Sequence, residues 1–141
     1  MIVSLKNKSN QNLKKRKIYF IHLDNSFTGS AMMLKTIIEG VPKENYDKTL
    51  ITSHNDGFLS SLTGEIARTY IDYQKSTYLF SKIYWFIKSQ ILILKHVYSL
   101  KKNDILYLNT FYPFIVGLFG KFLGIRVIYH IHEAYPNKKI H

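Results

Sequence analysis

Residues 104–133 read DILYLNTFYPFIVGLFGKFLGIRVIYHIHE, and this stretch decides the fold. The apolar run at 104–109 predicts a buried strand. Residues 114–122 predict a short helix that Gly124 ends, and the run at 126–132 predicts a second strand. A strand, a short helix and a second strand in close succession are typical of two parallel strands joined by a crossover.

The same alternation continues from this stretch back towards the N-terminus. It predicts an α/β fold, an open, mostly parallel Rossmann-like sheet flanked by helices on both faces. Residues 1–16 are polar and basic and predict a mobile arm, so the domain spans 17–141. The remaining strands are expected at 18–23, 48–53 and 66–72, and the remaining helices at 31–39, 58–63 and about 79–100.

The charge balance is strongly basic, with 20 Lys and Arg against 9 Asp and Glu and a net charge of +11. Such an excess favours acidic partners. Six of the basic residues lie within 1–17, however, and a solvated tail explains them. The rest of the chain carries 14 basic and 9 acidic residues, or +5, and no nucleic-acid recognition motif, so a nucleic-acid partner is not expected.

Targeting signals and cysteines are both missing from the sequence. The chain has no cysteine, which excludes disulfides and cysteine-based zinc sites. Residues 1–5 are too short for the apolar part of a secretory signal, and no run reaches the roughly 18 apolar residues of a membrane span. These observations favour a cytoplasmic protein, with peripheral binding to the inner face of the membrane as the alternative.

Ligands of open parallel sheets bind beyond the carboxyl ends of the strands. Three loops lie there: 25–30, 110–113 and 133–137. In the first, Gly29 and Ser30 lead into a helix whose N-terminus could bind phosphate, although Ser30 could equally cap that helix. The glycine-rich dinucleotide fingerprint and the P-loop are absent, so no cofactor is predicted.

The segment His130-Ile131-His132-Glu133 ends the last predicted strand. Two histidines and a glutamate could bind a metal, but a single H-x-H at a strand end is weak evidence, and we predict no metal. His130 is expected to be structural, because it lies within the strand. His132 lies at the end of the strand and is the better site residue, since a neutral imidazole there could bind a sugar hydroxyl or a developing charge.

The segments DILYLNT and VIYHIHE resemble retaining glycosyltransferases of family four, which have the GT-B architecture. The segment at 28–31 resembles the entry loop of that family more loosely. The resemblance implies that Gly29 and Ser30 lie near the donor phosphates and that Asn109 and Thr110 border the acceptor. It also implies that His132 approaches the transferred sugar as the catalytic residue, and that Glu133 supports its loop.

The resemblance further implies transfer of a sugar from a nucleotide-sugar to a lipid-linked or polysaccharide acceptor in surface glycan synthesis. No donor-binding domain follows His141, so we expect the chain to be inactive without a second domain. A partner chain could supply that domain. The alternative is a non-catalytic, membrane-associated subunit of a split glycosyltransferase that binds the acceptor.

The long helix expected at about 79–100 carries apolar residues three or four positions apart: Phe80, Ile83, Ile87, Ile91, Leu94 and Tyr98. Lysines interrupt and flank this stripe. Such a helix could lie in a lipid interface, or it could pack on the sheet. The sequence leaves both interpretations open.

Overall fold

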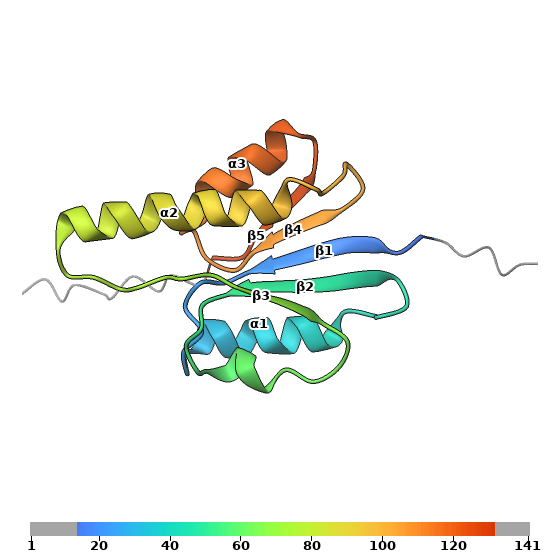
Figure 1. Cartoon of the computed structure of the whole chain (residues 1–141). Helices are drawn as coiled ribbons and strands as arrows, with labels where there is room; N and C mark the ends of the chain where they lie inside the picture. The colour runs from blue at the N-terminus through green and yellow to red at the C-terminus, as the bar shows by residue number, and fades with distance from the viewer. Residues whose placement is uncertain (1–13, 132–141) are drawn as a thin grey trace, which may run out of the picture.

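The computed structural model describes residues 14–131, and its centre is one parallel β-sheet (Figure 1). The strand order is β3-β2-β1-β4-β5, and every neighbouring pair is parallel. The predicted open α/β sheet is therefore confirmed. The strands are β1 (Arg16–Ile21), β2 (Tyr46–Thr52), β3 (Ala67–Tyr70), β4 (Ile105–Leu108) and β5 (Arg126–Tyr129).

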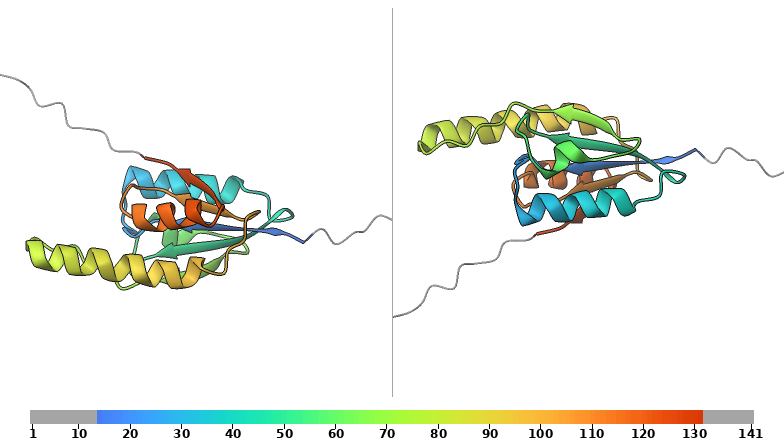
Figure 2. Two further views of the ribbon diagram at one scale, coloured as in Figure 1. Left: turned by 90° about the horizontal axis from the view of Figure 1, so that it is seen from above. Right: turned by 90° about the horizontal axis from the view of Figure 1, so that it is seen from below.

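Helices cover both faces of the sheet, as predicted (Figures 1 and 2). One face carries α1 (Gly29–Gly40) and the short 3-10 helix η1 (Phe58–Ser61). The other face carries α2 (Leu79–Val97) and α3 (Phe114–Phe122). Gly124 ends the last of these helices with a φ of +71°, a left-handed conformation that glycine adopts without steric cost.

The core has two halves because side chains of a strand point alternately to the two faces. In β4, Tyr107 packs with the cluster beneath α1, whereas Leu106 and Leu108 pack beneath α2 and α3. In β1, Phe20 and Ile21 divide in the same way. Strands buried on both faces read as continuous apolar runs, which is why β1 and β4 were recognisable from sequence.

The connections reverse direction between β1 and β4. From β1 the chain passes through α1 to β2 on one side, and from β3 it crosses through α2 to β4 on the other side. These two strands are neighbours, with Ile21 opposite Leu108. Such a reversal opens a crevice at the carboxyl ends of the strands, where ligands of open α/β sheets bind.

Helix α2 does not pack its predicted apolar stripe on the sheet. Its buried residues are Ser89, Gln90, Ile93 and Val97, all in its second half, because the first half extends past the edge of the sheet (Figures 1 and 2). Most of the predicted stripe faces solvent; its exposed members are Phe80, Ile83, Ile87, Ile91 and Tyr98. No helix within residues 14–131 is long and apolar enough to cross a membrane.

Candidate functional site

Two predicted site residues meet at the reversal between β1 and β4. Asn109 follows β4, is fully buried, and donates from Nδ2 to the carbonyl oxygen of Ser30 at 2.9 Å. Gly29 and Thr110 adjoin these two residues in the chain. The structure therefore brings together the two loops that the sequence analysis selected separately.

His22 belongs to the same cluster and was not predicted from the sequence. Its side chain is 2% exposed, and its Nδ1 lies 3.4 Å from Nδ2 of Asn109. An amide nitrogen only donates, so Nδ1 is the accepting partner in this contact. The sequence signal was available, because a titratable side chain directly follows the buried run of β1.

The N-terminus of α1 faces this crevice without a side-chain cap. Thr28 is the N-cap residue, but its side chain makes no capping hydrogen bond and instead lies 3.2 Å from Oγ of Ser30. Ser30 lies inside the first turn, so the interpretation of Ser30 as the cap is wrong. The first turn of α1 has no acidic residue, and its N–H groups suit an anion.

Gly29 leaves room for such an anion. A Cβ at this position would meet no heavy atom within 4 Å, and the residue is exposed. Close approach of a ligand to this backbone stays a prediction.

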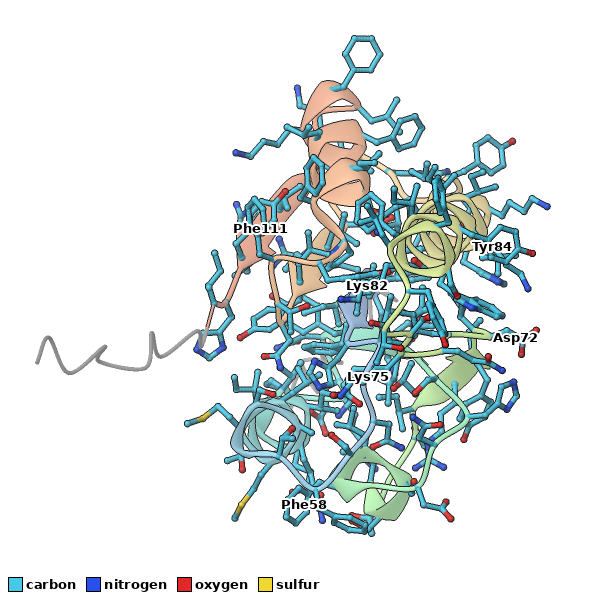
Figure 3. All side chains as sticks on the ribbon, turned by 90° about the vertical axis from the view of Figure 1, so that its left-hand side faces the viewer. Phe58, Asp72, Lys75, Lys82, Tyr84 and Phe111 are labelled. Carbon is cyan, nitrogen blue, oxygen red and sulfur yellow. The ribbon has the colours of Figure 1, made fainter. Side chains whose placement is uncertain are left out.

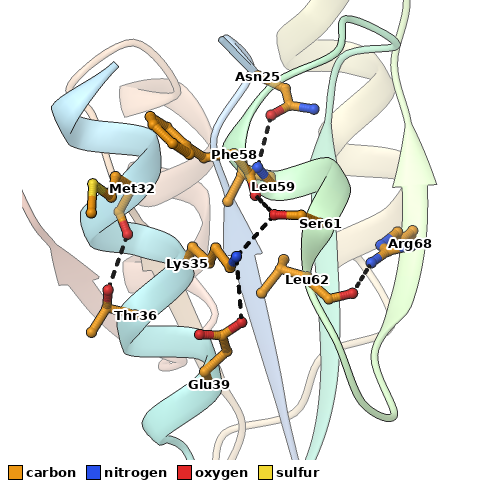
Figure 4. Close-up of polar contacts among 10 residues, drawn as sticks. All are labelled: Asn25, Met32, Lys35, Thr36, Glu39, Phe58, Leu59, Ser61, Leu62 and Arg68. Atoms are coloured by element: carbon orange, nitrogen blue, oxygen red, sulfur yellow. Dashed lines mark hydrogen bonds and ion pairs between the residues drawn. The ribbon is translucent and has the colours of Figure 1, made fainter. Parts of the chain in front are cut away.

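Asn25 fixes the loop between β1 and α1 and was also missed. Its side chain is 1% exposed. Nδ2 donates to the carbonyl oxygen of Asn55 at 2.6 Å and to Oγ of Ser60 at 3.0 Å. Oδ1 accepts from the backbone N–H of Leu59 at 3.1 Å, the contact drawn in Figure 4. Asn25 therefore ties the candidate anion loop to the segment that follows β2.

His130 lies just after β5, which ends at Tyr129, and not within the strand as predicted; its structural role stays a prediction. Its Nδ1 lies 2.5 Å from Oη of Tyr107, and burial raises the pKa of that phenol, which keeps it protonated. His132 and Glu133 lie outside the described residues. Within residues 14–131, no group of three or more histidine, aspartate or glutamate side chains could hold a metal ion.

A hollow of about 480 Å³ lies against the first turns of α2. Figure 3 looks onto this end of the molecule and labels Lys75 and Lys82, which both line the hollow. The lining includes these lysines and the aromatic residues Tyr73, Trp85, Phe86 and Tyr112. None of the predicted site residues lines the hollow.

Burial and one ion pair define the chemistry of the hollow. Burial raises the pKa of Tyr112 to about 12 and also raises that of Tyr73, so both phenols are neutral hydrogen-bond donors near neutral pH. Lys75 Nζ lies 2.6 Å from Oδ2 of Asp24 in the β1–α1 loop. The hollow is thereby connected to the loop that carries Gly29.

Comparison with known proteins yields no match: no protein-family model, curated protein or solved structure is significantly similar to this chain. The functional interpretation therefore depends on the geometry of the site and on the sequence resemblance. The geometry provides an uncapped helix N-terminus, a buried amide and an aromatic hollow at one edge of the sheet.

Proposed function

We propose that the chain is the acceptor-side domain of a glycosyltransferase of GT-B architecture. The observation that carries the proposal is the contact between Asn109 and Ser30, which joins the two loops at the reversal of the sheet. Both residues belong to the segments that resemble family-four glycosyltransferases. The complete reaction would move a sugar from a nucleotide-sugar to a hydroxyl of a lipid-linked or polysaccharide acceptor, with a second domain holding the donor.

The roles of the described residues follow from their chemistry. The free N–H groups at the start of α1, beside Gly29, would face the donor diphosphate and stabilise its departing charge. Oδ1 of Asn109 is buried without a hydrogen-bond partner among residues 14–131. A buried acceptor without a partner costs free energy, and a sugar hydroxyl donating to Oδ1 would remove that cost.

His132 and Glu133 receive their roles from the resemblance alone. His132 would approach the transferred sugar, and Glu133 would support its loop. We place the protein in the cytoplasm, where nucleotide-sugars are available to it. The second candidate function is a non-catalytic subunit that binds the acceptor in the same crevice but transfers no sugar. The exposed apolar stripe of α2 supports this candidate, because such a subunit would be membrane-associated.

The test is a map of backbone amide shifts in the chain as it is titrated with uridine- and guanosine-diphosphate sugars and with a lipid extract containing acceptors. The proposal expects shifts confined to residues 25–31 and 109–112, weakened in Asn109→Ala. Shifts only elsewhere, or none with any ligand, would sink it. Transfer of radiolabelled sugar to the extract, with and without a partner supplying a donor domain, then separates an enzyme from an acceptor-binding subunit.

A further inference from the structure

The first half of α2 exposes most of its apolar side chains to solvent, although Phe86 packs against the rings of Tyr112 and Phe114. It extends past the carboxyl edge of the sheet (Figures 1 and 2). We call residues 78–87 the overhang. Phe80 is 87% exposed, Tyr84 58% and Ile87 50%, and Tyr78, Leu79 and Ile83 are exposed as well. An exposed apolar surface of this kind marks a binding surface for a protein or a membrane.

Two lysines lie at the overhang: Lys82 is within it and Lys88 follows it directly. Lys75, just before it in the sequence, pairs with Asp24. Lys88 Nζ lies 4.5 Å from the centre of the Trp85 ring and 5.9 Å from that of Tyr84. Among the described residues, neither Lys82 nor Lys88 pairs with an acidic side chain. The overhang therefore fits an anionic partner.

The combination of side chains selects among anionic partners. A second copy of this surface would bring lysines against lysines, which opposes self-association. Nucleic acid offers bases and phosphates but no apolar surface that would cover Ile83 and Ile87. An anionic bilayer offers both phosphates for the lysines and an apolar boundary for the isoleucines, with tyrosine and tryptophan at the headgroup level.

We propose that the overhang of α2 lies in the surface of an anionic lipid bilayer. Phe80, Ile83 and Ile87 enter the boundary between headgroups and acyl chains, and Lys82 and Lys88 contact lipid phosphates. Because the overhang extends beyond the carboxyl edge of the sheet, the bilayer then lies next to the candidate site. The inference goes beyond the proposed function and stands without it, since it requires no sugar transfer.

Trp85 provides the direct readout, because it is the single tryptophan of the chain and belongs to the first half of α2. The full chain is mixed with vesicles of phosphatidylcholine, alone or with phosphatidylglycerol, and separated by flotation. We expect binding to the anionic vesicles, a blue shift of Trp85 fluorescence, and quenching by lipids brominated near the headgroup. Soluble glycerol phosphate should not reproduce the blue shift.

Two variants test the two halves of the contact. Lys82→Gln with Lys88→Gln should weaken vesicle binding about tenfold or more, because each lysine near an anionic surface contributes attraction. Ile83→Ser with Ile87→Ser should also weaken it by about tenfold. Lys82, Ile83 and Ile87 are exposed and Lys88 is half-buried, and circular dichroism verifies the fold. The matched control, Lys43→Gln with Lys101→Gln, removes the same charge away from the overhang and should bind like the unchanged chain.

Several results would overturn the proposal. One is the absence of binding to anionic vesicles. Another is binding in which Trp85 is not quenched, since the basic residues at 6–17 would then explain the affinity. Unchanged vesicle binding by both overhang variants would also overturn the proposal. The proposal would also be overturned if the chain did not bind vesicles but formed a dimer that the double variant Ile83→Ser with Ile87→Ser dissociates.

Discussion

The side-chain amide of Asn109 donates to the carbonyl oxygen of Ser30 at 2.9 Å and thereby joins the end of β4 to the first turn of α1. Because Asn109 is fully buried, Asn109→Ala would leave that contact and the one to His22 unmade. We expect a loss of about 1–3 kcal/mol in the free energy of unfolding. Urea denaturation followed by circular dichroism measures it. Thr110→Ala is the neighbouring control and should change stability by less than about 0.5 kcal/mol.

A second prediction concerns Asn25, whose side chain forms three hydrogen bonds. Asn25→Ala removes all of them and leaves the backbone N–H of Leu59 without this acceptor. We expect a loss of about 2–3 kcal/mol and faster amide hydrogen exchange in residues 25–30 and 57–61. Normal exchange at both segments would show that Asn25 does not hold the two loops together. Asn103→Ala, at an exposed residue, is the matched control.

The order of helices and strands could be predicted from sequence largely because β1 and β4 are mostly buried apolar runs and glycines lie at the ends of α1 and α3. The strand predicted at 104–109 corresponds to β4 (Ile105–Leu108), and the helix predicted at 114–122 has the same bounds as α3. The strand order was not predicted, since it depends on contacts between segments far apart in the sequence. The reversal between β1 and β4 follows from those contacts alone.

The face of α2 shows where periodicity misleads. The sheet-facing positions include Ser89 and Gln90, whose polar groups bond to the carbonyl oxygens of Phe86 and Tyr112. Hydrophobic spacing selected the stripe with more apolar side chains, and most of that stripe is solvent-exposed. In the site, the loops were predictable from the rule for parallel sheets. Asn25 was not, because its importance comes from burial, and His22 was missed although it directly follows the buried run of β1.

Two glycines make a paired prediction about packing and ligand access. A Cβ at Gly117 would lie 2.5 Å from Cζ of Tyr129 and 2.8 Å from Cδ1 of Leu108, so Gly117→Ala should cost about 1–3 kcal/mol through overpacking. Gly29→Ala meets open space and should stabilise α1 by about 0.5–1 kcal/mol. Thermal unfolding measures both changes.

Gly29→Ala also tests the candidate anion site, because stability and binding should then change in opposite directions. The added methyl group lies where a phosphate would approach the backbone. We expect weaker amide shifts at residues 28–31 on titration with a nucleotide-sugar, in a protein that is at least as stable. Unchanged shifts would argue against phosphate binding at the start of α1.

Tyr112 makes stability depend on alkaline pH. Burial raises its pKa from 10.0 to about 12, so between these values the unfolded chain loses the phenolic proton while the folded chain retains it. The unfolded state then binds fewer protons, and stability falls as pH rises. The contribution is therefore fully present below pH 10.0 and is lost towards pH 12.

Tyr112→Phe removes this titration but keeps the ring beside Phe86. We expect the difference in urea midpoint between the unchanged chain and Tyr112→Phe to be constant at lower pH and to shift in favour of Tyr112→Phe across that window. A constant difference throughout would show that Tyr112 titrates alike in the folded and unfolded chain.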